Sequence, residues 1–303
     1  MFPNVSGAGN EWHISSQPGI FTITAVTDDI VRLALTPTDA PAHQTWALAP
    51  EVAALPAPQV VVEQHDDRLI LCTASLAVTA RLQTELRIEI TRGDGSPVIQ
   101  DAPDHPRPAM PDQHLQWNIA LAAGERVFGG GLRTGRLDKR GRVLTFWSTD
   151  PLPHHDDNTD AMYQSFPFLI GLRDGKAHGI FYDTNWRAVA DIGVSDPNRL
   201  SFTAEGRDLV AHICCGPTLA DVLAQYTTLT GHMPPQPRWS MGYQQSRWGY
   251  LTTNDVREVA REFRARQIPC DAIYLDIDYM DGYRDFTWGP QRFPDPAGLL
   301  REL

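Results

Sequence analysis

The chain has 303 residues, of which 42% are hydrophobic and 21% charged, and a formal net charge of −11. The negative charge and the lack of a basic run argue against nucleic-acid binding, and no apolar run approaches the roughly 18 residues of a membrane span. A chain this long buries about three quarters of its unfolded surface without a disulfide framework, so we expect four reduced cysteines. With no signal-peptide layout at the N-terminus, we expect a cytoplasmic protein.

The first two thirds of the chain predict short β-strands joined by tight turns. Apolar and polar residues alternate over 21–36, 59–82 and 85–100, and again over 167–184. The expected turns are Asp28-Asp29, His65 to Asp67, Gly93 to Gly95, and Asp174-Gly175. Many strands with turns at intervals of about ten residues predict an antiparallel β-sandwich.

A helix is expected next, over residues 217–231. Its predicted apolar face consists of Leu219, Val222, Leu223 and Tyr226, and Gly231 provides a stop signal. The proline-rich residues 233–237 follow. We therefore predict a sandwich domain over 1–232, a linker over 233–237, and a different domain over 238–303.

Residues 238–303 have the pattern of a strand, a helix and a second strand. We expect a strand over 238–246 and an amphipathic helix capped by Thr253 or Asn254. A nearly continuous apolar strand is expected over 270–278. Such a βαβ unit makes its two strands parallel.

A last helix begins with Asp295 as cap and Pro296 at its first position. Two parallel strands with one crossover leave open edges and an uncovered face, so we expect this unit to be the start of a larger barrel. The alternative is that the βαβ unit docks on the sandwich.

Carboxylates gather at the end of the second expected strand. Asp276 lies where functional groups of parallel sheets and barrels collect, and Asp278 shares its face if the backbone stays extended. The loop after the first strand brings Trp248 to the same rim. Carboxylates beside aromatic rings suit a sugar, which offers hydroxyls and an apolar ring face. Asp281 and Asp285 are expected only to solvate the loop and pair with Arg284.

Several segments resemble glycoside hydrolase family 31, which includes the α-glucosidases. These are "YLDIDYMDGYRDFTW", the preceding "GYQQSRWGY" and the following "FPDP", together with "VFGGGLRTGRLDKRGRVLTFWSTD" and "FPFLIGLRDGKAHGIFYDT" upstream. The resemblance spans about Phe128 to Leu303. It implies a galactose mutarotase-like antiparallel β-sandwich followed by the first βαβ segment of a (β/α)8 TIM barrel, mostly β overall.

The resemblance also implies roles for individual residues. The aspartate matching Asp276 binds hydroxyls of the terminal sugar, and Ile277 lines the same subsite. Trp248 walls that subsite, and Asp150 resembles an aspartate on a long sandwich loop. The implied partner is an α-glucoside oligosaccharide, and no cofactor or metal is expected. A metal site at His154 to Asp157 is disfavoured, because consecutive loop residues rarely face one ion.

The catalytic carboxylates are not found in the sequence. Retaining glycosidases need a nucleophile and an acid/base about 5–5.5 Å apart across the scissile bond, whereas Asp276 and Asp278 are near neighbours in one expected strand. We therefore expect both catalytic residues beyond Leu303 and no turnover by these residues alone. The alternatives are a non-catalytic carbohydrate-binding module and a family 31 enzyme for another α-glycoside, such as an α-xyloside.

Overall fold

A computed structural model describes residues 4–16, 19–38, 43–82, 85–103, 115–151 and 155–303. The chain forms two compact units, Met1–His232 and Met233–Leu303, and each is described by itself. In the described part of the chain, no helix has both the length and the apolar character needed to cross a membrane.

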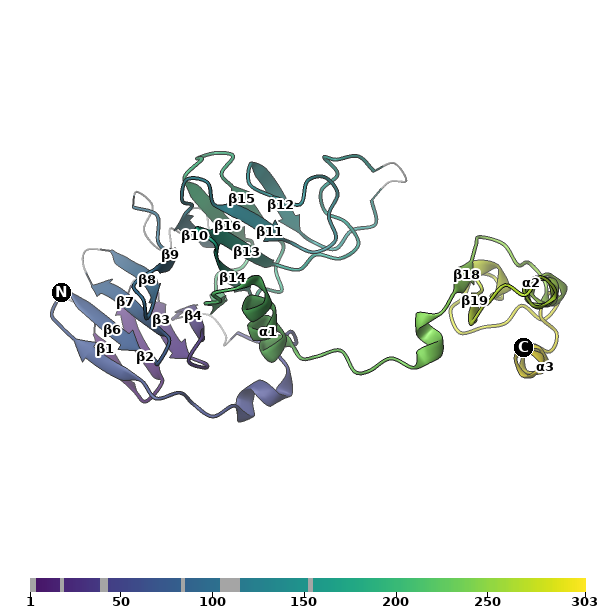
Figure 1. The fold of residues 1–303 in the computed structure, drawn as a ribbon, viewed down its shortest axis with the longest axis horizontal. Helices are drawn as coiled ribbons and strands as arrows, with labels where there is room; N and C mark the ends of the chain where they lie inside the picture. The colour runs from purple at the N-terminus through teal and green to yellow at the C-terminus, as the bar shows by residue number, and fades with distance from the viewer. Residues whose placement is uncertain (1–3, 17–18, 39–42, 83–84, 104–114, 152–154) are drawn as a thin grey trace. The chain divides into compact units, whose positions relative to one another are not determined.

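The first unit is an antiparallel β-sandwich built from three sheets (Figure 1). The eight-stranded sheet has the order β1 (Val5–Ala8), β2 (Glu11–Ser16), β3 (Gly19–Ala25), β4 (Ile30–Pro37), β17 (Leu209–Cys214), β14 (Lys176–Tyr182), β13 (Phe168–Arg173) and β11 (Arg126–Gly129). The five-stranded sheet has the order β5 (Val61–Gln64), β6 (Arg68–Cys72), β7 (Leu76–Leu82), β8 (Leu86–Arg92) and β9 (Pro97–Gln100). The four-stranded sheet has the order β10 (Leu115–Ala120), β16 (Arg199–Ala204), β15 (Ala188–Ile192) and β12 (Arg142–Phe146).

The predicted hairpins form at the turn residues identified in the sequence. Asp174 and Gly175 both adopt positive φ, 51° and 76°, and join β13 to β14 with Arg173 opposite Lys176. Two successive positive φ angles give a turn whose twist matches that of the flanking strands, and Asp and Gly tolerate this region best. The sequence prediction of this hairpin is confirmed.

One hydrophobic core contains residues from all three sheets. Its largest side chains are aromatic: Trp117 and Tyr182 each stack on Phe202, at centroid distances of 6.5 and 4.9 Å. The Trp117 indole also donates a hydrogen bond of 3.0 Å to buried Asp101. A buried carboxylate needs such donors, so Asp101 ties β10 to the core through polar as well as apolar contacts.

The helix α1 (Leu219–Thr230) covers the other face of the large sheet. Thr218 and Asp221 form a reciprocal capping box at its start, and Gly231 ends it with φ 88°. Its buried residues are Val222 and Leu229.

The predicted apolar face of α1 is wrong at two positions, because Leu219 and Leu223 are 43% and 50% exposed. The helix packs on β14, and contacts with sheet residues determine which of its faces is buried. Tyr226 stacks on Phe168 at 3.9 Å, and Gly179 leaves space beside Val222. Sheet residues far away in sequence therefore determine which helix face is buried.

The second unit contains the predicted parallel strand pair. β18 (Gln244–Ser246) and β19 (Ala272–Tyr274) pair with Gln244 opposite Ala272, and α2 (Thr253–Ala265) connects them. The expected first strand is shorter than predicted, because Arg238–Met241 forms the 3-10 helix η3. The cap of α2 is Thr252, whose side chain accepts from the Asp255 amide, rather than Thr253 or Asn254.

The core of the second unit is small. Tyr250, Val256, Phe293 and Leu299 are buried together. Leu299 belongs to the last helix, α3 (Pro296–Glu302), where the predicted cap Asp295 accepts from the Gly298 amide at 2.9 Å. The prediction of this cap is confirmed.

The remaining short elements are 3-10 helices, η1 (Pro50–Ala54) in the first unit and η4 (Ile277–Tyr279) in the second.

Candidate functional site

The carboxylate-rich segment leaves the strand earlier than expected. β19 ends at Tyr274, and Asp276 caps η4 by accepting a 2.8 Å hydrogen bond from the Ile277 amide. The carboxylate competes with the sheet for backbone donors, which is typical of aspartate at a helix start. The prediction of a nearly continuous strand over 270–278 is therefore wrong. The side chains of Asp276 and Ile277 are exposed.

The turn of η4 separates Asp278 from Asp276. Asp278 is 8% exposed, and its Oδ1 accepts from the Tyr283 hydroxyl at 3.4 Å and lies 3.8 Å from Arg292 Nη1. Asp278 was expected to share the face of Asp276 only if the backbone stayed extended, and η4 means that this condition is not met. Asp278 is instead a buried acceptor that holds η4 against the residues before α3.

A hollow of about 600 Å³ brings Asp278 and Trp248 together. Its lining comes from the loop after β18, from α2 and from η4, and includes Arg247, Glu258 and Asp278. Trp248 is 77% exposed. An exposed indole is able to stack on a sugar ring while charged neighbours such as Arg247 and Glu258 bind its hydroxyls. Asp276 and Ile277 do not line this hollow, although residues 233–303 are all described.

Tyr250 holds the Trp248 loop in place. Its ring is buried in the small core, its φ is 60°, and its hydroxyl accepts from Gln245 Nε2 at 2.9 Å. This buried anchor two residues away lets Trp248 remain exposed on an ordered loop. Sequence analysis selected Trp248 for the sugar site and placed Asp278 beside it only if the backbone stayed extended; the structure brings both residues to this hollow through the turn of η4 instead. The position of Asp278, an acidic residue just after an apolar strand, was the feature of the sequence that indicated a place near the site.

Of the two predicted partners of Arg284 in the loop after η4, Asp281 pairs with it. Arg284 Nη2 donates to Asp281 at 2.5 Å. Both side chains are more than half exposed, so this pair is a surface contact of small energetic value.

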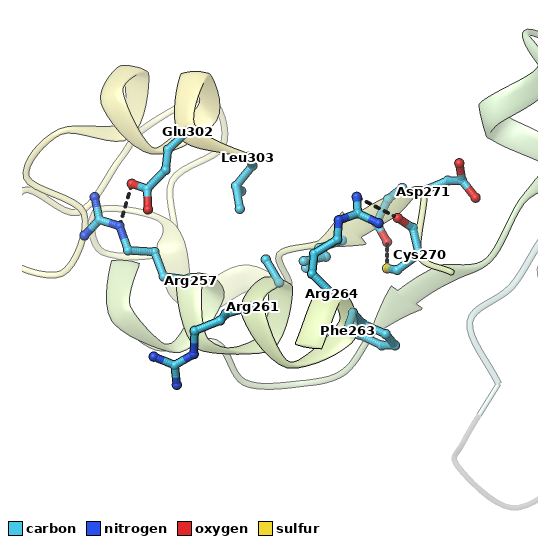
Figure 2. A pocket seen from close by; sticks show the side chains of 11 residues that line it. Arg257, Arg261, Phe263, Arg264, Cys270, Asp271, Glu302 and Leu303 are labelled. Carbon is cyan, nitrogen blue, oxygen red and sulfur yellow. Dashed lines mark hydrogen bonds and ion pairs between the residues drawn. The ribbon is translucent and has the colours of Figure 1, made fainter. Parts of the chain in front are cut away.

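A second hollow, of about 350 Å³, lies along α2 (Figure 2). Arg257 Nε donates to Glu302 at 2.7 Å, which links α2 to α3, and Arg264 donates to the Cys270 carbonyl at 3.4 Å. These contacts connect secondary-structure elements, and the lining has no indole ring on which a sugar would stack. We therefore assign the hollow in Figure 2 a structural role.

Asp150 belongs to the sandwich unit, where its side chain is exposed. The residue before it, Thr149, donates its amide to the Met162 carbonyl at 3.0 Å. Met162 is 6% exposed, so this contact fixes the backbone beside Asp150 to a buried residue.

Arg133 organises the base of the same segment. Its guanidinium donates to the Gly130 and Thr145 carbonyls at 2.9 and 2.6 Å and pairs with Asp160. Asp160 also accepts from the Thr145 amide at 2.8 Å. Arg133 is only 3% exposed, so one buried cation holds together the chain before and after Asp150.

The segment His154 to Asp157, which we did not expect to hold a metal, is partly outside the described residues, because it includes His154. Asp156 closes a local turn, accepting from the Asn158 amide at 2.8 Å. Within the described part of the chain, no three His, Cys, Asp or Glu residues are grouped to hold a metal.

The sandwich also contains a strongly perturbed histidine. His43 Nε2 lies 3.3 Å from Asp183, and Nδ1 lies 2.6 Å from Asp208. Hydrogen bonds to Asp183 and then to Asp208 raise the pKa of His43 to about 9. Beside them, burial lowers the pKa of His212 to about 4. The cluster combines a charged and a neutral imidazole and connects the segment at His43 to β17.

Two family models match the chain. The Glycosyl hydrolase 31 N-terminal galactose mutarotase-like domain matches residues 20–191, and the Glycosyl hydrolases family 31 TIM-barrel domain matches residues 233–303. The chain therefore belongs to glycoside hydrolase family 31. The resemblance seen in the sequence and the predicted fold class are both confirmed.

Named relatives agree with this assignment. The chain is 35% identical over 288 residues to "Alpha-glucosidase 2" of Bacillus thermoamyloliquefaciens, covering 94% of this chain and 36% of the relative. It is 28% identical to "Alpha-xylosidase XylQ" of Lactiplantibacillus pentosus, covering 81% of this chain and 32% of the relative. The chain thus spans about a third of the length of these relatives.

Solved structures show the same fold. A family 31 dextranase from Flavobacterium johnsoniae, complexed with isomaltotriose, aligns with a TM-score of 0.89 at 24% identity. The alignment covers 99% of this chain and 36% of the dextranase. A family 31 α-xylosidase from a soil metagenome aligns with a TM-score of 0.84 at 18% identity.

Proposed function

We propose that this chain is part of a retaining α-glucosidase that hydrolyses terminal α-linked glucose from oligosaccharides. The observation that carries the proposal is the 35% identity to "Alpha-glucosidase 2" over 94% of the chain. In this proposal, the chain supplies the sandwich domain and some of the residues that bind the terminal glucose.

The proposed sugar-binding residues are those of the family motif. Asp276 is exposed at the carboxyl end of β19, where its carboxylate is free to accept from sugar hydroxyls in addition to the Ile277 amide. Trp248 offers an exposed indole to the ring face, and the family resemblance adds Asp150. Asp278 positions η4 through Arg292 and Tyr283 rather than acting on the sugar.

The chemistry requires two carboxyl groups that flank the scissile bond. In a retaining enzyme one attacks the anomeric carbon while the other protonates the departing oxygen, and the second then activates the water that releases glucose. Asp276 and Asp278 do not form such a pair, because η4 turns one outward and buries the other. We therefore propose that the nucleophile and the acid/base are supplied by residues beyond Leu303.

The test compares the product of the complete gene with the 303-residue chain on p-nitrophenyl α-D-glucoside. We expect the complete product to hydrolyse this substrate with retention of the anomeric configuration, which NMR of the released glucose detects. We expect no turnover from the 303 residues. In the complete product, Asp276→Ala removes a charged acceptor worth about 1.5–3 kcal/mol per hydroxyl bond, so kcat/KM falls at least about tenfold. Robust turnover by the 303 residues, or an Asp276→Ala variant as active as wild type, contradicts the proposal.

An α-xylosidase is the second candidate, favoured by the match to "Alpha-xylosidase XylQ". The two sugars differ at the C6 hydroxymethyl group, so the ratio of kcat/KM on p-nitrophenyl α-glucoside and α-xyloside decides between them. If the complete gene product binds α-glucans but hydrolyses neither substrate, the chain is instead a carbohydrate-binding module.

A further inference from the structure

The sandwich unit carries an aromatic hollow that the proposed function does not use. Its volume is about 280 Å³, and it lies between the end of β12, the residues before β13 and the turn after β14. Two tryptophans, Trp147 and Trp186, contribute to it and are 53% and 54% exposed. The lining residues are Phe146, Trp147, Ser148, Ser165, Pro167, Thr184, Asn185 and Trp186.

Both tryptophans are held on rigid supports. Trp147 directly follows Phe146, whose ring is 4% exposed and stacks on Phe202 in the main core. Trp186 packs against Gly206, where an added Cβ would lie 2.1 Å from its Cδ1 atom. The Trp147 backbone and the Trp186 ring are therefore held in place, while about half of each side chain is exposed. Such preorganised rings bind a ligand with little loss of side-chain entropy.

The rest of the lining is polar but uncharged. Ser148, Ser165, Thr184 and Asn185 supply hydroxyl and amide groups, and none of the eight lining residues, all within the described chain, carries a charge. The Ser165 Oγ is buried and has no hydrogen-bond partner among the described residues. A buried hydroxyl without a protein partner carries a free-energy cost.

The composition of the lining indicates which class of ligand the hollow fits. Half of the lining side chains are polar, which disfavours an apolar protein surface, and the lack of charge disfavours a phosphate or a carboxylate. A neutral molecule with an apolar face and hydroxyls at its edge fits both tryptophans and the polar groups. A pyranose has this character, and the volume is at the small end for ligand pockets.

We propose that the hollow at Trp147 and Trp186 binds a glucosyl unit of an α-glucan. The identity of the sugar rests on the proposed function, whereas the hollow and its neutral aromatic lining do not. The site adds a second sugar contact to the one proposed at Trp248 and Asp276.

The experiment measures binding of maltotriose and isomaltotriose to the 303-residue chain by saturation-transfer NMR and calorimetry. Trp147→Ala and Trp186→Ala are each expected to weaken Kd at least about tenfold, since each removes an aromatic platform. Trp46→Ala is the matched control, because Trp46 is fully exposed and lies outside the hollow, and its Kd should equal that of wild type.

Further variants separate this inference from the proposed function. Trp147→Phe and Trp186→Phe keep a ring and should retain most of the binding, which guards against loss through misfolding. Asp276→Ala should leave binding at the hollow within about twofold of wild type. Loss of binding in Asp276→Ala with full binding in both tryptophan-to-alanine variants overturns the inference and leaves the proposed function standing. Absence of binding by wild type, or equal binding by all variants, also overturns it.

Discussion

The Arg133 anchor allows a quantitative prediction about the segment that carries Asp150. Arg133→Met keeps the aliphatic bulk and removes the guanidinium, so the Gly130 and Thr145 carbonyls lose donors at 2.9 and 2.6 Å. Asp160 loses its cationic partner and keeps the Thr145 amide at 2.8 Å. Removing one member of a buried ion pair costs about 3–5 kcal/mol. Because Asp160 is 26% exposed and water can reach it, we expect the lower end, about 3 kcal/mol.

The assay is thermal unfolding of the sandwich unit, with hydrogen exchange to locate the change. About 3 kcal/mol corresponds to a Tm decrease of roughly 6–12 °C for a domain of this size. Exchange should accelerate most at the Thr145 and Thr149 amides. Arg126→Met is the matched control, since Arg126 is exposed on β11, and it should change Tm by at most about 1–2 °C. If Arg133→Met lowers Tm no more than Arg126→Met, the anchor reasoning is refuted.

Two further predictions concern the sandwich. Gly179→Ala places a Cβ 2.8 Å from Val222 Cγ1, so urea titration should show a loss of about 1–3 kcal/mol in the free energy of unfolding. The control is Gly93→Ala, whose added Cβ has its nearest neighbour atom 3.6 Å away and should have little effect. Equal unfolding midpoints for the two variants would disprove the close packing of α1. Because the pKa of His43 is raised to about 9, its pairing with Asp183 and Asp208 stabilises the fold fully below about pH 6.5, and this stabilisation is lost as pH rises through about 9. Wild-type Tm should therefore fall between pH 7 and 10 more steeply than that of His43→Gln, and parallel pH profiles would contradict this.

Local signals predicted the strands and turns well. Asp174 and Gly175 tolerate positive φ wherever they occur, so their hairpin was readable without knowledge of the partner strands. The same holds for Asp295, which satisfies amide groups within its own helix. These features depend on residues a few positions apart, and the sequence contains all of that information.

Features that depend on distant residues were not predicted. The exposed Leu223 and the buried Leu229 are both apolar residues of α1, and contacts with β13 and β14 decide between them. The burial of Asp278 depends on the turn of η4 and on contacts with Tyr283 and Arg292. The spacing of the carboxylates in the sequence does not indicate these contacts. The sugar-binding roles of Asp150, Trp248, Asp276 and Ile277 remain predictions drawn from the family motif.

Hydrolysis of p-nitrophenyl α-D-glucoside by the complete gene product tests the central claim most directly. The account predicts turnover with retention of the anomeric configuration, a decrease in kcat/KM of at least about tenfold in Asp276→Ala, and no turnover by residues 1–303 alone. A complete product that does not cleave α-glucosides, or that cleaves them equally well without the Asp276 carboxylate, would contradict the account.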